Sequence, residues 1–339
     1  MKIVTFGEIL LKFSPPNYQR FLQATAMDAE YSGAEANVAV SLARFGVDSA
    51  FVSKVPENDL GEAALNALRH HGVDISHVAR GGERIGIYFA EKGASQRPSK
   101  VIYDRKGSAI ACATTADFDW NAIFEGADWF HFTGITPALS DSLASICLEA
   151  CQAARAKGMT ISCDLNYRQK LWSCEKAKAV MTDLCRFVDV CIANEEDAAD
   201  VFGIRTVDRD GFTGTLDGGS YVFVARQLQE RFGFKKVAIT LRESISASDN
   251  NWSAILCDGA KTCTSRKYAI HIVDRIGSGD SFCAGLIYGL HHYGDRQQAL
   301  EFAVAASCLK QTMEGDFNLA GVAEVEGLLN GDVTGRIKR

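Results

Sequence analysis

The chain has 339 residues, of which 47% are hydrophobic and 23% are charged, and its formal net charge at pH 7 is −6. This composition is ordinary for a folded globular protein of one or two domains, and it excludes a disordered chain. Because the chain is mildly acidic and has no Lys/Arg stripe, we expect no nucleic acid and no membrane as partner, and we look for single arginines that bind a small molecule.

The N-terminal sequence MKIVTFGEILLKF predicts a first strand. Its apolar run is broken by Glu8 and no small-residue cleavage site follows, which argues against a signal peptide. No segment approaches the roughly 18 apolar residues of a membrane span. The 11 cysteines are odd in number and form no CxxC pair, so we expect buried, reduced thiols in a cytoplasmic protein rather than disulfides or a zinc site.

Two segments in the first third of the chain predict a small antiparallel sheet. Residues 12–32 and 84–107 contain short alternating runs joined by glycine-bearing turns, such as IGIYFAEKG and then SKVIYDR. Helical patterns at residues 34–45 and 60–70 lie between them. A sheet made of two pieces that are separate in sequence, at the edge of a larger domain, is expected to form a lid over a binding crevice.

From about residue 125 onward, short apolar runs alternate with helical patterns. The runs ADWFHFTGI, MTISCDLN, VDVCIANEE and FKKVAITL are each separated by such a pattern. This βαβ series predicts a central, mostly parallel sheet with helices on both faces and right-handed crossovers. We therefore expect an α/β protein, a single domain over residues 1–339 that forms a three-layer sandwich and carries the small β lid.

The predicted parallel strands end in polar residues. Since ligands of open α/β sheets bind in the crevice beyond the carboxyl ends of the strands, these residues are candidates for a binding site. They are Thr133, Asp164, Asn166, Asn194, Thr240 and Arg242.

The stretch IGSGDSF at residues 276–282 joins a predicted strand to a helix. The amides of Gly277, Ser278 and Gly279 can point at one spot, and the positive end of the helix adds to them, so the stretch predicts an anion site. It is not a Walker loop, because GxxxxGK[ST] does not occur in the sequence. The next residue, Asp280, could cap the helix, or it could serve as a base that the helix end helps to keep ionised.

The pattern D-x-x-G-x-G-D-x-F at residues 274–282 resembles the C-terminal signature of the ribokinase-like (PfkB) family of carbohydrate kinases. YSGAEANVAVSLARFG at 31–46 resembles the N-terminal glycine and asparagine signature of that family, and IANEEDA at 192–198 stands where the family has N-x-x-E. The three segments occur in the family's order, and the resemblance covers nearly the whole chain. Within the family, the chain is most similar to 2-keto-3-deoxygluconate kinases.

This resemblance implies a kinase that uses ATP and Mg²⁺. In the family, the aspartate at the position of Asp280 is the base for the sugar hydroxyl, and the preceding amides hold the transferring phosphate. The positions implied to contact the sugar acid are Gly33, Asn37, Tyr88, Tyr103, Arg105 and Arg168. Those implied to contact ATP are Asn166, Arg168, Asn194, Thr240, Arg242, Gly277 and Gly279. An arginine suits a sugar acid because its planar guanidinium matches a carboxylate.

Other interpretations of these residues remain open. Tyr88 and Tyr103 could face a lid interface, and Arg105 could form a weak surface ion pair with the neighbouring Asp104. Asn37 could merely cap a turn.

The sequence also departs from the family pattern at two places. Asp197 replaces the glutamate of N-x-x-E, so we take Glu196 as the candidate that orients the water around Mg²⁺. Arg242 and Glu243 stand where many members have a glycine-rich segment, so side chains as well as backbone are expected to approach ATP there.

The activity expected from the residues and the resemblance together is ATP-dependent phosphorylation of the terminal hydroxyl of a sugar acid. The first candidate is 2-keto-3-deoxygluconate, which would give its 6-phosphate. The alternatives are a fructokinase or another neutral-sugar kinase of the same family, and a sugar-binding regulator that has lost catalysis. The edges of the lid would suit pairing into a homo-oligomer.

Overall fold

The computed structural model describes residues 1–205, 218–259 and 261–331. Nine strands form the main sheet in the order β14-β13-β12-β11-β10-β9-β1-β4, and β15 pairs with β13. The strands from β4 to β12 in this order are parallel, and β13 to β15 are antiparallel. Their bounds are β1 Lys2–Phe6, β4 Asp48–Val52, β9 Trp129–Thr133, β10 Thr160–Asp164, β11 Val190–Ala193, β12 Lys236–Ser244, β13 Asp249–Asp258, β14 Lys261–Thr264 and β15 Tyr268–His271.

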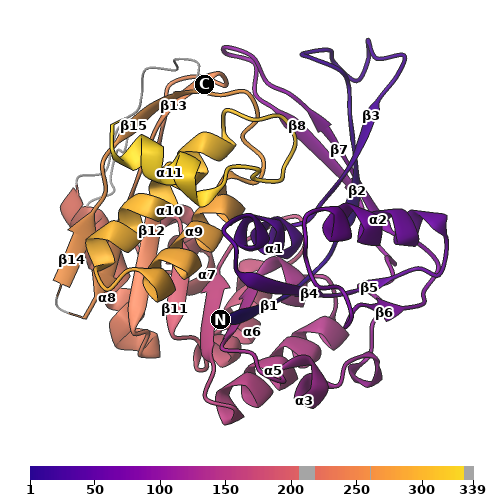
Figure 1. Ribbon diagram of the computed structural model, residues 1–339, viewed down its shortest axis with the longest axis horizontal. Coiled ribbons are helices and arrows are strands. Elements are labelled where there is room, and N and C mark those ends of the chain that lie inside the picture. Colours follow the sequence, from indigo (N-terminus) through magenta and orange to yellow (C-terminus); the bar gives the residue numbers. More distant parts are fainter. Residues whose placement is uncertain (206–217, 260, 332–339) are drawn as a thin grey trace.

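Helices cover both faces of the main sheet (Figure 1). One apolar core packs the first group of helices on one face: α1 Ala34–Arg44, α9 Ser278–His292, α10 Arg296–Lys310 and α11 Val322–Leu329. A second core packs the other face: α3 Trp120–Ile123, α4 Ile135–Ala138, α5 Asp141–Ala156, α6 Cys174–Cys185, α7 Glu195–Phe202 and α8 Gly218–Phe232. Strands such as β9 and β11 are buried along their whole length, as expected of parallel strands between two helical layers.

The second sheet is small and lies apart from the main one, at the upper right in Figure 1. Its order is β3-β2-β7-β8, with β2 Leu10–Ser14, β3 Asp28–Ser32, β7 Gly86–Glu91 and β8 Lys100–Asp104. The two segments that predicted it each form an antiparallel hairpin, and the hairpins join through a parallel pairing of β2 with β7. Within the predicted segment 12–32, only the end of β2 and the whole of β3 are strand. We call β3-β2-β7-β8 the small sheet.

The remaining elements of the N-terminal third lie between the two halves of the small sheet in sequence. They are α2 Asp59–His70 and the two-residue strands β5 Lys54–Val55 and β6 Ala79–Arg80. A short 3₁₀ turn, Thr115–Asp117, follows β8. The expected helices at 34–45 and 60–70 are α1 and α2. In the part of the chain that the structure describes, no helix is both long and apolar enough to cross a bilayer.

Side-chain caps explain where several helices begin. Ser140, Ser173 and Asp295 each accept a hydrogen bond from a backbone amide of the first turn of α5, α6 and α10. These amides have no partner within the helix, so a capping oxygen satisfies them. Helix α9 is different, because its N-cap is Gly277 and no side chain caps it. No side-chain oxygen therefore accepts from its first-turn amides.

Helix α9 packs closely on α10 through two glycines one turn apart. A Cβ on Gly285 would lie 2.8 Å from the Ala303 Cα, and one on Gly289 would lie 2.7 Å from the Ala299 Cα. The contact atoms belong to backbone, which cannot rotate away as a side chain can. This close packing holds α9 at a fixed distance from α10. It also fixes the turn at residues 277–279, which we call the anion turn.

We expect Gly289→Ala to lower the free energy of unfolding by about 2 kcal/mol, because overpacking against α10 outweighs the better helix propensity of alanine. Gly294→Ala is the matched control, since nothing lies within 4 Å of a Cβ at that position. Urea unfolding of both variants measures the difference. Equal stability of the two variants would contradict the close packing.

Candidate functional site

A cavity of about 450 Å³ opens beyond the carboxyl ends of β10, β11 and β12, between the start of α9 and the small sheet. Most of the residues expected to form a site line it: Gly33, Asn37, Tyr88, Tyr103, Arg105, Asn166, Arg168, Asn194, Thr240, Arg242, Gly277, Ser278, Gly279 and Asp280. They come from segments that are up to 247 residues apart, from Gly33 to Asp280, and the parallel strands bring them to one edge of the sheet. Glu196 is exposed and does not line the cavity.

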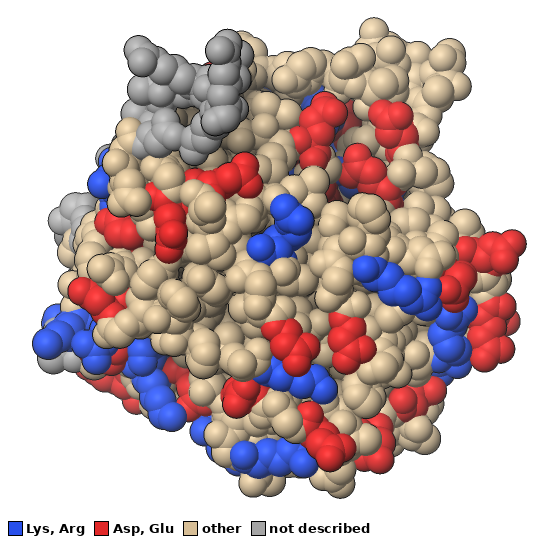
Figure 2. Space-filling model, in the orientation of Figure 1, with Lys and Arg blue, Asp and Glu red and all other residues tan. Residues whose placement is uncertain are grey.

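The charges around this cavity have both signs. Figure 2 shows Lys and Arg interspersed with Asp and Glu on the face drawn there. Within the cavity, four arginines face five carboxylates. The arginines are Arg105, Arg168, Arg242 and Arg275, and the carboxylates are Glu8, Glu35, Asp164, Asp197 and Asp280. A mixed lining of this kind suits a ligand that carries several separated negative groups, each of which needs its own donor.

The turn at Gly277 requires glycine for two reasons. Its φ of +82° lies in the left-handed region, and a Cβ there would lie 2.1 Å from the backbone oxygen of Asp316. Around Gly279, by contrast, a Cβ would meet nothing within 4 Å, because that side faces the open cavity. The Ser278 amide donates a hydrogen bond of 3.3 Å to the Arg275 carbonyl. The residues of the turn line the cavity, which places the positive end of α9 beside it.

Asp280 lies in the first turn of α9 and faces the cavity. The side-chain amide of Asn37, on α1, donates a hydrogen bond to its Oδ2 at 2.7 Å. Burial raises the pKa of Asp280 to about 7, and the hydrogen bond from Asn37 opposes that rise. Burial therefore outweighs the help expected from the helix end, and near neutral pH this carboxylate can both take and release a proton.

Two further carboxylates line the cavity on the side of β10 and β11. Burial raises the pKa of Asp197 to about 6, and burial together with Asp197 and Asp280 raises the pKa of Asp164 well above its usual value. Asp197 closes a capping box with Asn194 and also accepts a hydrogen bond from the Tyr167 amide at 2.9 Å. Asp197 is thus a buried carboxylate of the IANEEDA segment, whereas Glu196 is exposed.

Among the described residues, no group of three or more His, Cys, Asp or Glu side chains could hold a metal ion. Magnesium usually binds through one or two carboxylates together with water and substrate phosphates rather than in an all-protein cage. Asp164, Asp197 and the nearby Asn194 supply oxygen atoms of that kind at one wall of the cavity. The residues therefore fit a Mg²⁺ ion that arrives with a phosphorylated ligand.

Arg105 follows β8 and is buried against Glu8. Its Nε donates to Glu8 Oε2 at 2.7 Å, and the Ser108 hydroxyl donates to Glu8 Oε1 at 2.6 Å. The guanidinium carbon lies 5.2 Å from the centre of the Tyr103 ring. A surface pair of Arg105 with Asp104 is not formed, because Asp104 pairs with Arg84 at 2.9 Å.

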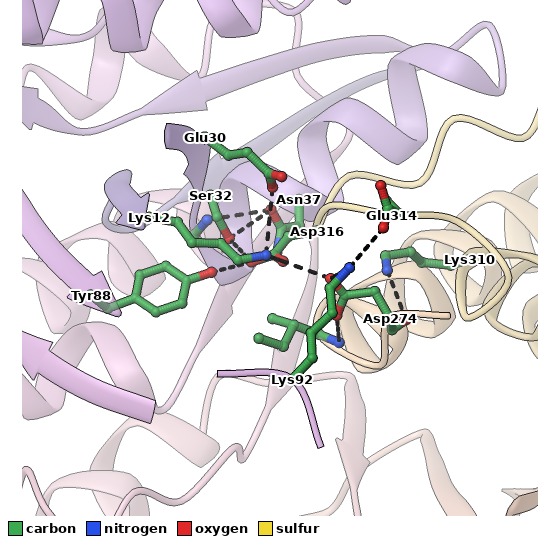
Figure 3. Close-up of polar contacts among 12 residues, drawn as sticks. Lys12, Glu30, Ser32, Asn37, Tyr88, Lys92, Asp274, Lys310, Glu314 and Asp316 are labelled. Atoms are coloured by element: carbon green, nitrogen blue, oxygen red, sulfur yellow. Dashed lines mark hydrogen bonds and ion pairs between the residues drawn. The ribbon is translucent and has the colours of Figure 1, made fainter. Parts of the chain in front are cut away.

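Tyr88 is buried in the small sheet, and its ring stacks on Tyr103 with centres 5.7 Å apart. Its hydroxyl donates a hydrogen bond to Asp316, which also accepts one from Ser32 and is paired with Lys12 (Figure 3). Nearby, Gly33 precedes α1, and a Cβ there would lie 2.0 Å from the Glu8 carbonyl oxygen. Gly33 therefore has a steric role in letting α1 approach the end of β1.

The arginines opposite the small sheet lie on different strands and loops. The guanidinium of Arg168 donates to the Tyr167 carbonyl at 3.1 Å, and that of Arg275 donates to the Ala247 carbonyl at 3.0 Å. Arg242 stacks over Trp252 on the neighbouring strand β13, with its guanidinium carbon 5.3 Å from the ring centre. All three extend along the wall formed by β10, β12 and the turn before α9.

Sequence reasoning missed three buried carboxylates near the site. Glu8 was visible only as the charge that breaks the first apolar run. Glu35 accepts hydrogen bonds from the Thr133 amide and hydroxyl and from Thr136, and it lies so near the backbone that a Cβ on Gly7 would be 2.0 Å from its Oε2. Asp316 lies in the loop after α10, where no pattern pointed to it.

Comparison with known proteins decides the family. The family model for pfkB family carbohydrate kinases matches residues 1–318. The chain belongs to this family. It is a sugar kinase with the ribokinase-like fold, and its expected use of ATP follows from that membership.

Three proteins show how near the likeness is. This kinase is 35% identical over 335 residues to a 2-dehydro-3-deoxygalactonokinase of Haloferax volcanii, with 98% of each chain covered. It is 30% identical to a 2-dehydro-3-deoxygluconokinase of Bacillus subtilis, with 93% of this chain and 91% of the relative covered. The crystal structure of a 2-dehydro-3-deoxygluconokinase from Thermotoga maritima matches with a TM-score of 0.94 and 51% identity, with 98% of each chain covered.

The raised pKa of Asp280 predicts a change in stability with pH. Because its folded-state pKa lies above the value of the unfolded chain, its favourable contribution is complete below about pH 4 and is lost as the pH rises through about 7. Asp280→Asn cannot ionise, so we expect this variant to exceed the wild type in free energy of unfolding by about 4 kcal/mol at pH 8 and to match it near pH 4.

Urea unfolding at the two pH values measures this difference. Asp104→Asn is the control, since Asp104 is exposed and Arg84 lowers its pKa, and this variant should show no gain at pH 8. If Asp280→Asn were no more stable than the wild type at pH 8, the raised pKa of Asp280 would be refuted.

Proposed function

We propose that this kinase transfers the γ-phosphate of ATP to the terminal hydroxyl of a sugar acid, with 2-keto-3-deoxygluconate as the first candidate. This compound is the 2-dehydro-3-deoxygluconate after which the Bacillus and Thermotoga relatives are named. The observation that carries the proposal is a cavity lined both by an arginine, Arg105, that follows the small sheet and by a carboxylate, Asp280, beside the anion turn.

The sugar acid would lie beneath the small sheet. Glu8 accepts hydrogen bonds from the Nε and Nη2 atoms of Arg105, so the Nη1 edge of the guanidinium would meet the substrate carboxylate. Glu8 fixes the orientation of the Arg105 guanidinium. It also offsets part of the positive charge of Arg105, which weakens the attraction of Arg105 for the substrate carboxylate. Tyr103 and Tyr88 would flank the carbon chain. Gly33 and Asn37 would complete the pocket on the side of α1.

ATP would lie along the ends of β10, β11 and β12. Its γ-phosphate would meet the first amides of α9 at Gly277, Ser278 and Gly279, and Arg168 would approach the phosphates from the loop after β10. Asn166, Asn194, Thr240 and Arg242 would contact the rest of the nucleotide. Magnesium, held near Asp164 and Asp197 rather than near Glu196, would supply positive charge that offsets the charge of the phosphates.

Phosphoryl transfer requires one base and good alignment. In this proposal the sugar hydroxyl gives its proton to an Oδ atom of Asp280 while its oxygen bonds to the γ-phosphorus and the bond to ADP breaks. Asn37 would hold the carboxylate in place, and the pKa of about 7 leaves it largely ionised above neutral pH. The amides and the end of α9 would stabilise the charge that spreads over the transferring phosphate.

The small sheet would act as a lid on a single domain. It carries Tyr88 and Tyr103 and borders the cavity from above the anion turn. Closing on the sugar would exclude water, which would otherwise compete as phosphate acceptor. The outer strands β3 and β8 are edges of this sheet, and Ile102 and Tyr103 on β8 are exposed, so the same sheet could join two copies of the chain. Sedimentation of the purified protein measures that assembly.

A screen of ADP formation with different sugars tests the substrate class. The panel is 2-keto-3-deoxygluconate, its C4 epimer 2-keto-3-deoxygalactonate, fructose and ribose, each with ATP and Mg²⁺. Both epimers are needed because the Haloferax relative is named for the galactonate. Preference for either acid supports the proposal. Preference for fructose or ribose would make it a neutral-sugar kinase, and binding of a sugar without ADP formation would make it a regulator.

We expect Asp280→Asn to lower kcat by at least about 10²-fold, because a general base contributes about 10² to 10⁴ in rate. The dissociation constant of ATP, measured by calorimetry, should change little, since the amides and arginines are intact. Wild-type kcat in this variant would refute the role of Asp280.

We expect Arg105→Lys to raise KM for the sugar acid by about tenfold or more while KM for ATP is unchanged, because lysine cannot offer the planar fork. Arg84→Lys is the matched control: Arg84 lies just before β7 and pairs with Asp104 outside the cavity. The measurement is initial rate against sugar acid concentration. An equal effect of the two substitutions would contradict the assignment of Arg105.

A further inference from the structure

Behind the anion turn lies a buried cluster of opposite charges, Lys12, Lys310, Asp274 and Asp316, which is drawn in Figure 3. Lys12 Nζ lies 2.6 Å from Asp316 Oδ1 and 3.7 Å from Asp274 Oδ2. Lys310 Nζ donates to the Asp274 carbonyl at 3.1 Å. None of the four has a role in the mechanism above, although two lysines without exposure to water are costly to bury unless they are paired.

The cluster joins the small sheet to the segments around the anion turn. Lys12 lies on β2, whereas Asp274 lies in the turn before α9 and Asp316 lies in the loop after α10. Burial lowers the pKa of Lys12, but Asp316, Asp274 and Glu30 together more than reverse this and hold its pKa above the usual value. Lys12 therefore stays charged, and its ion pairs with Asp274 and Asp316 connect β2 to the turn before α9 and to the loop after α10.

Asp316 makes two contacts that point in different directions. Its carboxylate accepts hydrogen bonds from the hydroxyls of Tyr88 and Ser32 on the small sheet, and pairs with Lys12 there. Its backbone oxygen abuts Gly277 so closely that a Cβ would lie 2.1 Å away. The Lys310 Cε lies 3.3 Å from the same Cβ position. A shift of Asp316 must therefore move the turn.

We propose that Asp316 is a positioning residue that couples the sugar side of the site to the anion turn, so that sugar bound beneath Tyr88 strengthens the binding of nucleotide phosphate at Gly277 to Gly279. The proposal rests on the function proposed above, because it takes Tyr88 as a neighbour of the sugar. Sugar that fixes the Tyr88 hydroxyl also fixes the Asp316 carboxylate, and the rigid contact at Gly277 transmits this to the amides.

A role in stability alone would not require this arrangement. Apolar residues of similar volume can replace a buried ion pair without loss of stability. The Asp316 carboxylate instead accepts hydrogen bonds from residues of two strands, Tyr88 and Ser32, and both of these partners line the cavity. Coupling between two ligands is also a quantity that a purely structural role would leave unchanged.

Calorimetry on the full chain measures the coupling. The probes are the β,γ-imido analogue of ATP with Mg²⁺, and the sugar that the screen finds to be phosphorylated. The dissociation constant of the analogue is measured with and without saturating sugar, and the ratio of the two is the coupling factor. We expect a factor of at least about 5 in the wild type.

Two variants break the connection in different ways. Tyr88→Phe removes the hydroxyl and keeps the ring and every buried charge, so it should fold. Asp316→Asn removes the acceptor charge and leaves Lys12 with less compensation. We expect the coupling factor to fall below about 2 in both. Glu314→Gln is the matched control, since Glu314 lies in the same loop but is exposed and pairs with Lys92 at 3.0 Å, and its factor should equal that of the wild type.

The outcomes are distinct. A coupling factor near 1 in a wild type that phosphorylates a sugar overturns the coupling but leaves the proposed kinase function intact. A preference for a neutral sugar overturns the proposed sugar-acid substrate, and the coupling can still be measured with that neutral sugar. If Tyr88→Phe or a folded Asp316→Asn keeps the wild-type coupling factor, the cluster has only a structural role and the proposal is overturned. Loss of the factor in Glu314→Gln also overturns it, because the effect would then belong to the whole loop. If Asp316→Asn does not fold, Tyr88→Phe decides.

Discussion

The hydrogen bond from the Asn37 amide to the Asp280 carboxylate, 2.7 Å long, connects the two parts of this kinase that the reaction must bring together. Asn37 lies on α1, directly after the strand β3 of the small sheet, and Asp280 lies in the first turn of α9, directly after the anion turn. The bond favours the ionised carboxylate that burial disfavours. In the reaction we propose, the alignment of sugar and phosphate would depend on the same two helices meeting at this point.

The site concentrates groups that would be unfavourable elsewhere. Carboxyl groups at Asp164, Asp197 and Asp280 have raised pKa values because they are removed from water near one another. Two extensive apolar cores on the faces of the sheet hold the helices in place regardless of these charges. The fold can therefore tolerate a destabilising arrangement at its edge, which is common where catalysis requires a shifted pKa.

Much of the fold and of the site could be predicted from short patterns. The alternation of apolar runs and helical spacing identified β9 to β12 and their helices, and the residues of IGSGDSF form the turn and first turn of α9. Asn166, Asn194 and Thr240 line the cavity because parallel strands all end at one edge. Glu196, chosen from the sequence to orient the water around Mg²⁺, is exposed and does not line the cavity, whereas Asp197, held in a capping box with Asn194, does.

The sequence by itself determined the α/β class, the family signatures, the anion turn and the residue types available around it. These features depend on periodicity and on glycines within a few residues of one another, so a local pattern is enough to reveal them. Only the tertiary structure decided that Arg105 pairs with Glu8, and that Asp316 connects Tyr88 to Gly277. Arg105 and Glu8 lie 97 residues apart in sequence, and Tyr88 and Asp316 lie 228 residues apart. Their contacts depend on how two sheets and several helices pack, which no local pattern encodes.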